Sequence, residues 1–176
     1  GDYNPSGKLT ISFPYAVGQI PVYYNHKNTG RPNNGTRFTS RFLDIPNEPL
    51  YPFGHGLSYT TFTYSDIKLD TDAMPRNGSV TASVSVRNSG PLPGEEVVQL
   101  YIRDLVGSVS RPLRELKGFR KIHLNPGESR NVDFRITEKE LAFYTKDMTY
   151  EAEPGAFRIF IGTSSTDVKE TGFILL

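Results

Sequence analysis

From residue 62 onward, short stretches of the chain alternate apolar and polar residues, and this period constrains the fold more than any other feature. In SVTASVSVRN, Val80, Val84 and Val86 alternate with polar residues. Successive side chains of a β-strand point to opposite faces, so a period of two predicts a strand with one buried face and one solvated face. The same alternation recurs in EVVQLYIRD, SRNVDFRI and GAFRIFIG, and ETGFILL closes the chain.

Turn signals separate these predicted strands. Asn125–Glu128 and Glu153–Ala156 both carry Pro followed by Gly, the pair that a type II turn requires. The only helix signal is Thr137–Leu141, where Thr137 can cap a single turn and Glu140 stands at the capping-box spacing. Seven or so short antiparallel strands, with turns at roughly 8–12-residue spacing, predict an all-β sandwich of immunoglobulin type.

Residues 1–58 have a different texture, rich in Pro, Gly, Asn and Tyr. Their one strand signal is Leu9–Phe13, and the glycines and prolines that follow it exclude long helices. A long stretch without regular structure is uncommon in a compact domain unless it lies against a neighbour. We therefore expect a mostly irregular N-terminal arm over 1–58 and a sandwich over 59–176.

Composition excludes several classes of function. The chain has 20 Lys and Arg against 19 Asp and Glu, and no basic stripe indicates nucleic acid. The sequence contains no apolar run of about 18 residues, so no membrane-spanning helix is predicted. The absence of cysteine excludes disulfides, thiolate metal sites and a cysteine nucleophile. The opening GDYNPSGK carries no signal-peptide pattern, and we interpret it as the interior of a larger protein.

Three histidines are the candidate metal ligands. His26, His55 and His123 lie far apart in the sequence, without the short spacing typical of zinc sites. We therefore expect no metal and no cofactor. His123 follows Ile122 in a strand pattern and is expected at the surface or at a sheet edge.

Paired carboxylates are the candidate groups for glycoside cleavage, which needs two of them about 5–10 Å apart. Glu95 and Glu96 are neighbours on a predicted strand, so their side chains point to opposite faces and cannot share a substrate. Glu151 and Glu153 adjoin a turn and are interpreted as solvated charges. There is also no nucleophile elbow and no phosphate-binding loop. The residues alone thus indicate no catalytic apparatus.

The segment LYPFGHGLSYTTF concentrates aromatic residues on a glycine-rich loop. Two interpretations are open for it. Tyr51, Phe53, Tyr59 and Phe62 can bury area where the arm joins the sandwich, or the loop, with His55, can line a binding site. A large aromatic side chain buried at a joint contributes about 1.5–3 kcal/mol.

Several ordered motifs resemble the C-terminal part of glycoside hydrolase family 3. The resemblance runs over essentially the whole chain and rests on long segments, which are GDYNPSGKL, PVYYNHKNTGRP, YPFGHGLSYTTF, GEEVVQLYIRD, SRPLRELKGFRKIHLNPGES and EPGAFRIFIGTSS. It implies that residues 1–58 are a remnant of an α/β sandwich domain with a connector. It also implies that residues 59–176 form a fibronectin type III-like domain.

The resemblance further implies a periplasmic parent enzyme that hydrolyses terminal non-reducing β-D-glucosyl residues with retention, a β-glucosidase. The aspartate nucleophile and the glutamate acid/base of the family lie upstream of Gly1, and no residue here matches either of them. The fragment alone is therefore expected to have no catalytic activity. His26 and His55 are expected at the rim of the parent's substrate site.

Two roles remain open for the fragment. It can brace the upstream catalytic domains of the same enzyme, or mediate self-association through the arm or a sheet edge. Alternatively, it can act as a carbohydrate- or surface-binding module, for which Tyr101 and Phe160 on the solvated strand faces are the candidate aromatics. Neither nucleic acid nor a membrane is expected as a partner.

Overall fold

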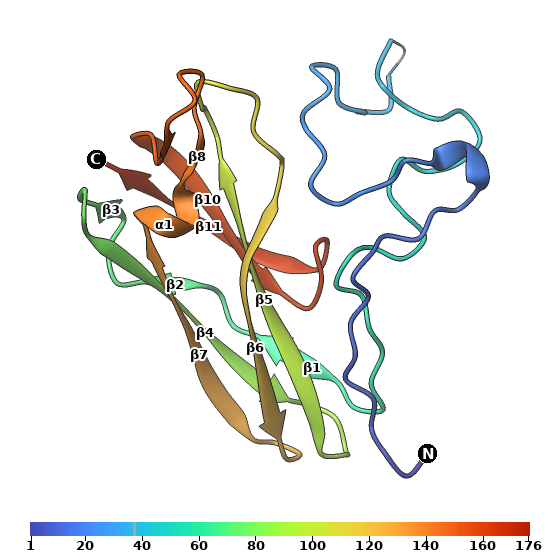
Figure 1. The fold of residues 1–176 in the computed structure, drawn as a ribbon. Coiled ribbons are helices and arrows are strands. Elements are labelled where there is room, and N and C mark those ends of the chain that lie inside the picture. The colour runs from blue at the N-terminus through green and yellow to red at the C-terminus, as the bar shows by residue number, and fades with distance from the viewer. Residues whose placement is uncertain (37) are drawn as a thin grey trace.

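The computed structural model describes residues 1–36 and 38–176. Figure 1 shows two parts, a β-sandwich and an irregular arm that runs along one side of it. The elements in chain order are η1 (Val17–Gln19), β1 (Phe62–Tyr64), β2 (Lys68–Leu69), β3 (Ala73–Met74), β4 (Ser79–Asn88), β5 (Gly94–Asp104), β6 (Glu115–Leu124), β7 (Ser129–Thr137), α1 (Glu138–Leu141), β8 (Phe143–Tyr144), β9 (Tyr150–Glu151), β10 (Gly155–Gly162) and β11 (Val168–Leu175).

Two sheets form the sandwich. In the first sheet, β4 pairs with β7 on one side and with β1 and β2 on the other. The second sheet has the order β3-β11-β10-β5-β6, in which only the short β3–β11 pair is parallel. A separate hairpin joins β8 to β9. The all-β sandwich fold predicted from the strand pattern is thus confirmed.

The core lies between the inner faces of these two sheets, where the apolar residues of the alternating patterns meet. On β4, Val80, Val84 and Val86 are all buried, as are Phe134 on β7 and Ile159 on β10. Because each strand contributes every second residue, the burial period of two in the structure matches the sequence period.

One of the two predicted type II turns is confirmed. At Asn125–Glu128, Gly127 has φ 78° and the Glu128 amide donates to the Asn125 carbonyl at 3.0 Å. At Glu153–Ala156 the prediction is wrong, because Gly155 has φ 155° and already begins β10. The Ala156 carbonyl accepts from the Leu105 amide, so pairing with the neighbouring strand extends this segment.

The predicted single helical turn is also confirmed. Thr137 caps α1, and its backbone amide donates to the Glu140 carboxylate at 2.8 Å. The hydroxyl of Thr137 accepts from the Lys139 amide at 3.3 Å. These contacts satisfy backbone donors that the first turn of a helix leaves unpaired.

The arm has little regular structure, as expected. The predicted strand Leu9–Phe13 bends at Thr10 and Ile11 and pairs only locally with the segment 51–55. Phe13 and Tyr51 exchange backbone hydrogen bonds, and the Leu9 amide donates to the His55 carbonyl at 2.8 Å. No second ladder flanks this pair among the described residues, so the prediction of a regular strand was wrong and an irregular two-stranded ribbon takes its place.

Candidate functional site

The arm covers part of the outer face of the five-stranded sheet, the face that points away from the core. On this face Gln99, Tyr101 and Phe160 are only 3%, 0% and 4% exposed. The expectation that Tyr101 and Phe160 form an exposed aromatic face is therefore wrong. Strand alternation placed them correctly, but it could not show that another part of the chain covers that face.

An aromatic cluster fills the centre of this contact. Tyr24 stacks on Phe53 with ring centroids 4.3 Å apart, and both arm residues meet Tyr101 edge to face at 5.8 and 6.5 Å. The Tyr24 hydroxyl accepts from the Leu116 amide at 3.2 Å. Burial raises the pKa of the Tyr101 hydroxyl. Edge-to-face and stacked pairs contribute beyond the area they bury, so this cluster joins the arm to the sheet.

Gln99 fastens the backbone of the arm beside this cluster. Its amide nitrogen donates to the Gly54 carbonyl at 3.1 Å and to the Thr163 carbonyl at 2.6 Å. The Ser165 amide donates to the Phe53 carbonyl at 2.9 Å. Gly54 has φ 80°, and a Cβ added there would lie 2.1 Å from the Gln99 side-chain oxygen. Only glycine allows this close approach.

A buried ion pair fastens the arm farther along β5. Glu96 is 4% exposed, and its carboxylate accepts from Lys8 Nζ at 3.1 Å and from the Tyr64 hydroxyl at 3.0 Å. Burial raises the pKa of Glu96, while the Lys8 charge acts to lower it. Burial and the neighbouring carboxylate raise the pKa of Tyr64. Each member of this triad satisfies a polar group that would otherwise be costly to bury.

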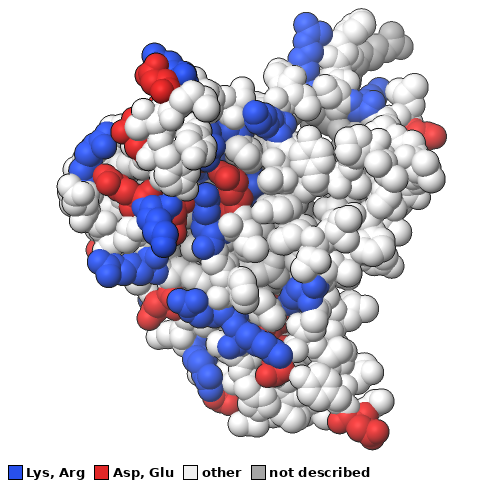
Figure 2. Space-filling view, viewed as in Figure 1, with Lys and Arg blue, Asp and Glu red and all other residues white. Residues whose placement is uncertain are grey.

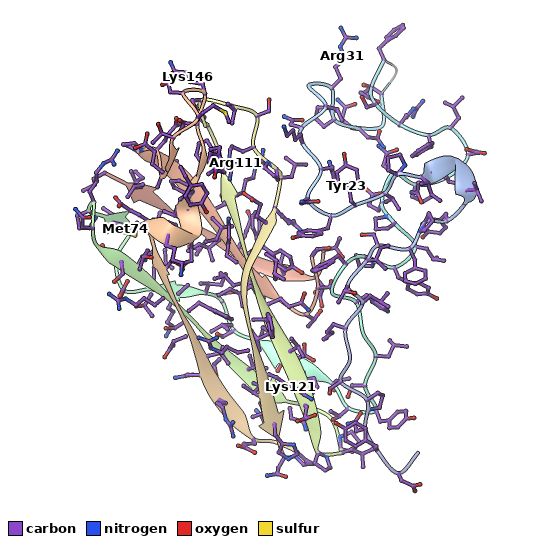
Figure 3. All side chains as sticks on the ribbon, in the orientation of Figure 1. Tyr23, Arg31, Met74, Arg111, Lys121 and Lys146 are labelled. Atoms are coloured by element: carbon purple, nitrogen blue, oxygen red, sulfur yellow. The ribbon has the colours of Figure 1, made fainter. Side chains whose placement is uncertain are left out.

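Glu95 has different partners, as expected for a strand neighbour. Its carboxylate accepts from the Tyr3 hydroxyl at 2.9 Å, from Ser6 at 3.2 Å and from Lys121 at 2.6 Å. The hydrogen bond from Lys121 is the main cause that lowers the pKa of Glu95. Figure 3 places Lys121 at the end of the sandwich near the start of the arm. The two carboxylates therefore tie residues 3–8 to the sheet and do not form a pair for glycoside cleavage.

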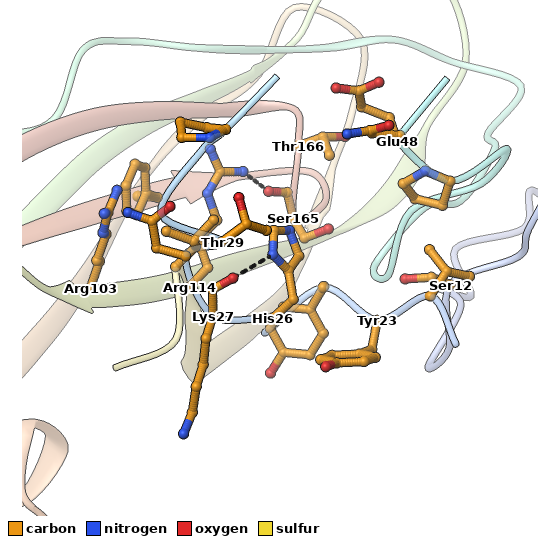
Figure 4. A pocket seen from close by; sticks show the side chains of 18 of the residues that line it. Ser12, Tyr23, His26, Lys27, Thr29, Glu48, Arg103, Arg114, Ser165 and Thr166 are labelled. Atoms are coloured by element: carbon orange, nitrogen blue, oxygen red, sulfur yellow. Dashed lines mark hydrogen bonds between the residues drawn. The ribbon is translucent and has the colours of Figure 1, made fainter. Parts of the chain in front are cut away.

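A cleft of about 610 Å³ lies between the far part of the arm and the sheet. Figure 4 shows Tyr23, His26 and Lys27 of the arm on one wall, and Arg103 and Arg114 of the sandwich on the other. The Arg114 guanidinium donates to the Ser165 carbonyl and lies over the Phe160 ring, 4.6 Å from its centroid. Arg103, Arg114, Arg158 and Lys27 line this cleft together with Glu48 and Glu170, so its lining carries a net positive charge.

The histidines do not converge. His26 is exposed in the cleft, with Nδ1 3.2 Å from the Lys27 carbonyl, whereas His55 stacks on Tyr51 at 5.2 Å. His123 is exposed on the edge strand β6, as predicted. No group of three or more His, Asp or Glu that could hold a metal occurs among residues 1–36 and 38–176.

The four aromatic residues of LYPFGHGLSYTTF have different environments. Phe53 belongs to the cluster described above, and Phe62 lies against the sandwich core. Tyr51 is 45% exposed and Tyr59 is 56% exposed. Two of the four aromatic side chains are thus about half exposed.

Exposed apolar side chains gather on the arm. Of the 23 large hydrophobic residues that are exposed in the described part of the chain, 14 lie within residues 1–59, which are only about a third of the sequence. Figure 2 shows that Lys, Arg, Asp and Glu cover the sandwich, while the arm side is mostly uncharged. Among the most exposed are Val17, Phe38 and Leu43. Such a patch is typical of an interaction surface.

Sequence reasoning missed Tyr24, Gln99 and the Lys8–Glu96 pair. A signal for one of them was present on β5, where Gln99 stands beside Tyr101 on the face expected to be solvated. A tyrosine and a glutamine side by side on a face expected to be solvated indicate that another part of the protein covers that face. No sequence signal could have assigned Lys8 to Glu96, because 88 residues separate them.

Comparison with known families gives two matches that together span most of the chain. Residues 1–59 match the Glycosyl hydrolase family 3 C-terminal domain, and residues 96–165 match the Fibronectin type III-like domain. The region between them contains β1, β2, β3 and β4. No helix in the described residues is long and apolar enough to cross a membrane.

Two relatives are similar in sequence over nearly the whole chain. The chain is 56% identical to the Periplasmic beta-glucosidase of Salmonella typhimurium, over 100% of this chain and 23% of that protein. It is 45% identical to a Putative beta-xylosidase of Formosa agariphila, over 99% of this chain and 22% of that protein. The chain therefore spans about a quarter of the length of these relatives.

A solved structure is also similar to this chain over nearly its whole length. The beta-glucosidase from Listeria innocua in complex with glucose superposes with a TM-score of 0.94 and 44% identity, over 99% of this chain and 25% of that chain. Both the arm and the sandwich are included in this superposition. The chain belongs to glycoside hydrolase family 3, as a C-terminal-domain segment followed by a fibronectin type III-like domain.

Proposed function

We propose that this chain is a non-catalytic structural part of a β-glucosidase, and that the exposed face of its arm docks on the catalytic domains of the same enzyme. The uncharged arm surface is the observation that carries this proposal. An apolar patch of this extent is unfavourable in water unless another surface covers it. The enzyme would hydrolyse terminal non-reducing β-D-glucosyl residues with retention, in the periplasm, with its nucleophile and acid/base upstream of Gly1.

The docking proposal is tested by hydrogen exchange in two samples, the 176-residue chain and the longer enzyme. The expected result is strong additional protection of amides in residues 10–24 and 38–50 in the longer enzyme. Amides of β4 and β7 serve as the internal control, since the sandwich core should exchange alike in both samples. Equal exchange of the arm in both samples would contradict docking.

Catalysis is tested separately with a p-nitrophenyl β-glucoside. The 176-residue chain should show no turnover above buffer, whereas the longer enzyme should turn over. Activity in the chain alone, retained after further purification, would overturn the non-catalytic role even if docking were correct.

We propose further that the division between arm remnant and sandwich lies at residues 58 and 59, and that Tyr51, Phe53, Tyr59 and Phe62 belong to the joint. His26 and His55 are proposed to lie at the rim of the substrate site. For His26 this is supported by its exposure in the cleft. In the longer enzyme, His26→Ala should raise KM without lowering the melting temperature. A change in stability alone would place His26 in the joint.

The alternative role, a carbohydrate- or surface-binding module, loses the support of Tyr101 and Phe160, because both side chains are buried. Self-association is retained as a proposal for the isolated chain. The ribbon formed by Leu9–Phe13 has an unpaired edge among the described residues, and such edges pair with other strands. Light scattering should show dimers or larger species of the chain that Ile11→Lys reduces. A strict monomer at all concentrations would contradict this.

A further inference from the structure

Three arginines form a row across the outer face of the five-stranded sheet. Arg103 on β5 is directly opposite Arg158 on β10. On its other side, β5 pairs with β6 up to Ile102 and Glu115, so Arg114 stands next to Arg103. Like charges placed directly opposite one another on a sheet are destabilising. The fold therefore maintains a concentration of positive charge that costs it stability.

The partners of these three arginines neutralise their positive charge only in part. Arg158 pairs with Glu170 at 2.6 Å, and Arg114 donates to the Ser165 carbonyl, which carries no full charge. Among the described residues, Arg103 has neither a hydrogen bond nor an ion pair. Burial lowers the pKa of Arg114, the charge of Glu170 acts to raise it, and the charge of Arg103 acts to lower it. The donors of Arg103 are thus available to a ligand in the cleft.

The opposite wall of the cleft offers neutral hydrogen-bonding groups. The arm contributes hydroxyls and amides, which belong to Tyr23, Asn28, Thr29, Asn33, Ser40 and Asn47. These side chains can donate to and accept from the hydroxyls of a polyol. Lys27, which also lines the cleft, extends away from the arginines in Figure 4. The charged wall is therefore the arginine row, and the polar wall is the arm.

We propose that this cleft binds a sugar acid, with its carboxylate on Arg103 and Arg114 and its hydroxyls toward the arm. Guanidinium groups bind carboxylates in a planar, two-pronged geometry, which makes arginine the favoured residue for this anion. A cavity of about 610 Å³ is in the size range of small-molecule sites. Glu48 and Glu170 also line the cleft and would disfavour ligands with several negative charges, so a single carboxylate fits better than a polyanion.

The experiment is a calorimetric or NMR titration of the 176-residue chain with glucuronate, and with glucose as the matched neutral sugar. The two sugars differ only in that a carboxylate replaces a hydroxymethyl group. Glucuronate is expected to bind at millimolar concentration and about tenfold or more tightly than glucose, because a charge-assisted hydrogen bond contributes most of the difference. Added salt should weaken only the glucuronate complex.

Two variants locate the site. Arg103→Gln should weaken glucuronate binding about tenfold and leave the melting temperature unchanged or raised, because it relieves repulsion within the row. Arg87→Gln is the matched control, an exposed strand arginine in the other sheet. It should leave binding unchanged. Equal binding of both sugars, no glucuronate binding, or an Arg103→Gln variant that binds normally would overturn the proposal.

A side chain of an upstream domain could supply the same carboxylate, so the titration is repeated with the longer enzyme. Binding of glucuronate that Arg103→Gln also weakens there supports a free ligand. Binding to the 176-residue chain that is lost in the longer enzyme overturns the free-ligand assignment and identifies the occupant as an upstream carboxylate. Neither result depends on whether the arm docks as proposed above, which hydrogen exchange reports separately.

Discussion

Different kinds of contact stabilise the sandwich and the arm. Backbone ladders connect almost every strand of the sandwich to a neighbour, and apolar residues from both sheets fill its core. Among the described residues the arm has only the isolated bridges Phe13–Tyr51 and Lys27–Pro112. It is held to the sandwich by a few backbone hydrogen bonds and by single side chains such as Lys8, Tyr24 and Phe53. The sandwich is therefore stabilised by many redundant contacts, whereas the arm depends on a few specific ones. Loss of one contact should have correspondingly different consequences in the two parts.

The largest effect is expected in the sandwich core. Ile159 is 0% exposed, and Ile159→Ala removes apolar contacts and leaves a cavity between the sheets. We expect it to lower the free energy of unfolding by about 2–5 kcal/mol. Ile11→Ala is the matched variant in the arm, where Ile11 is 63% exposed, and it should change stability by less than about 0.5 kcal/mol. Urea unfolding of both variants measures the contrast. Similar losses would show that the arm has a core of its own.

A smaller effect is expected where the arm meets β5. Gly54→Ala would force a side chain into left-handed backbone and against the Gln99 oxygen, which would displace Gln99 from its hydrogen bonds. We expect a loss of about 2–4 kcal/mol from the strain and the unpaired amide together.

Gly30→Ala separates the two causes. Gly30 has φ 77° but nothing within 4 Å of an added Cβ, so only the backbone strain of about 1–2 kcal/mol should appear. Equal losses in the two glycine variants would exclude a role for Gln99. Hydrogen exchange should also show the arm loosened in Gly54→Ala while the sandwich core stays protected.

The smallest effect is expected at the buried ion pair, and it depends on pH. Lys8→Met removes the main influence that lowers the pKa of Glu96, so that pKa rises further above its ordinary value of 4.5. A carboxyl group whose folded pKa is raised stabilises the fold fully below its unfolded pKa and loses that contribution as pH rises through the folded pKa. Lys8→Met should therefore be close to wild type near pH 4 and less stable by about 1–3 kcal/mol near pH 7.

The double variant Lys8→Met with Glu96→Gln is the control for that prediction. It carries no ionisable group at position 96, so the extra pH dependence should vanish. If the double variant keeps the pH dependence, another carboxyl group is responsible. Asp104 is the next candidate, since burial raises its pKa as well.

Most of the fold was predictable because local chemistry determines it. The alternation in Ser79–Asn88 predicts β4 residue for residue, and the capping box predicts α1. The turn at Glu153–Ala156 was not predictable, because the pairing of Ala156 with Leu105 overrides the preference of the Pro-Gly pair. Local turn preference is weak, and tertiary hydrogen bonds decided the outcome.

Less of the candidate site was predictable. The glycine-rich aromatic loop drew attention to Phe53, but its partners Tyr24 and Tyr101 lie far away in sequence. The arginine row could not be seen in the sequence either, because it depends on the register of three strands. Contacts of this kind arise only when the arm and the sandwich are assembled.

The covered outer face of the five-stranded sheet also bears on biosynthesis. The arm leaves the ribosome before the sandwich, and the Leu116 amide, which donates to the Tyr24 hydroxyl, lies 92 residues farther along the chain. The partners of Phe53 and Gln99 on the Thr163–Ser165 segment are translated later still. Since nascent chains emerge from the N-terminus at about 5–20 residues per second, the arm waits several seconds with its aromatic residues uncovered. Within residues 1–176, the arm is thus the part that waits longest for its partners during synthesis.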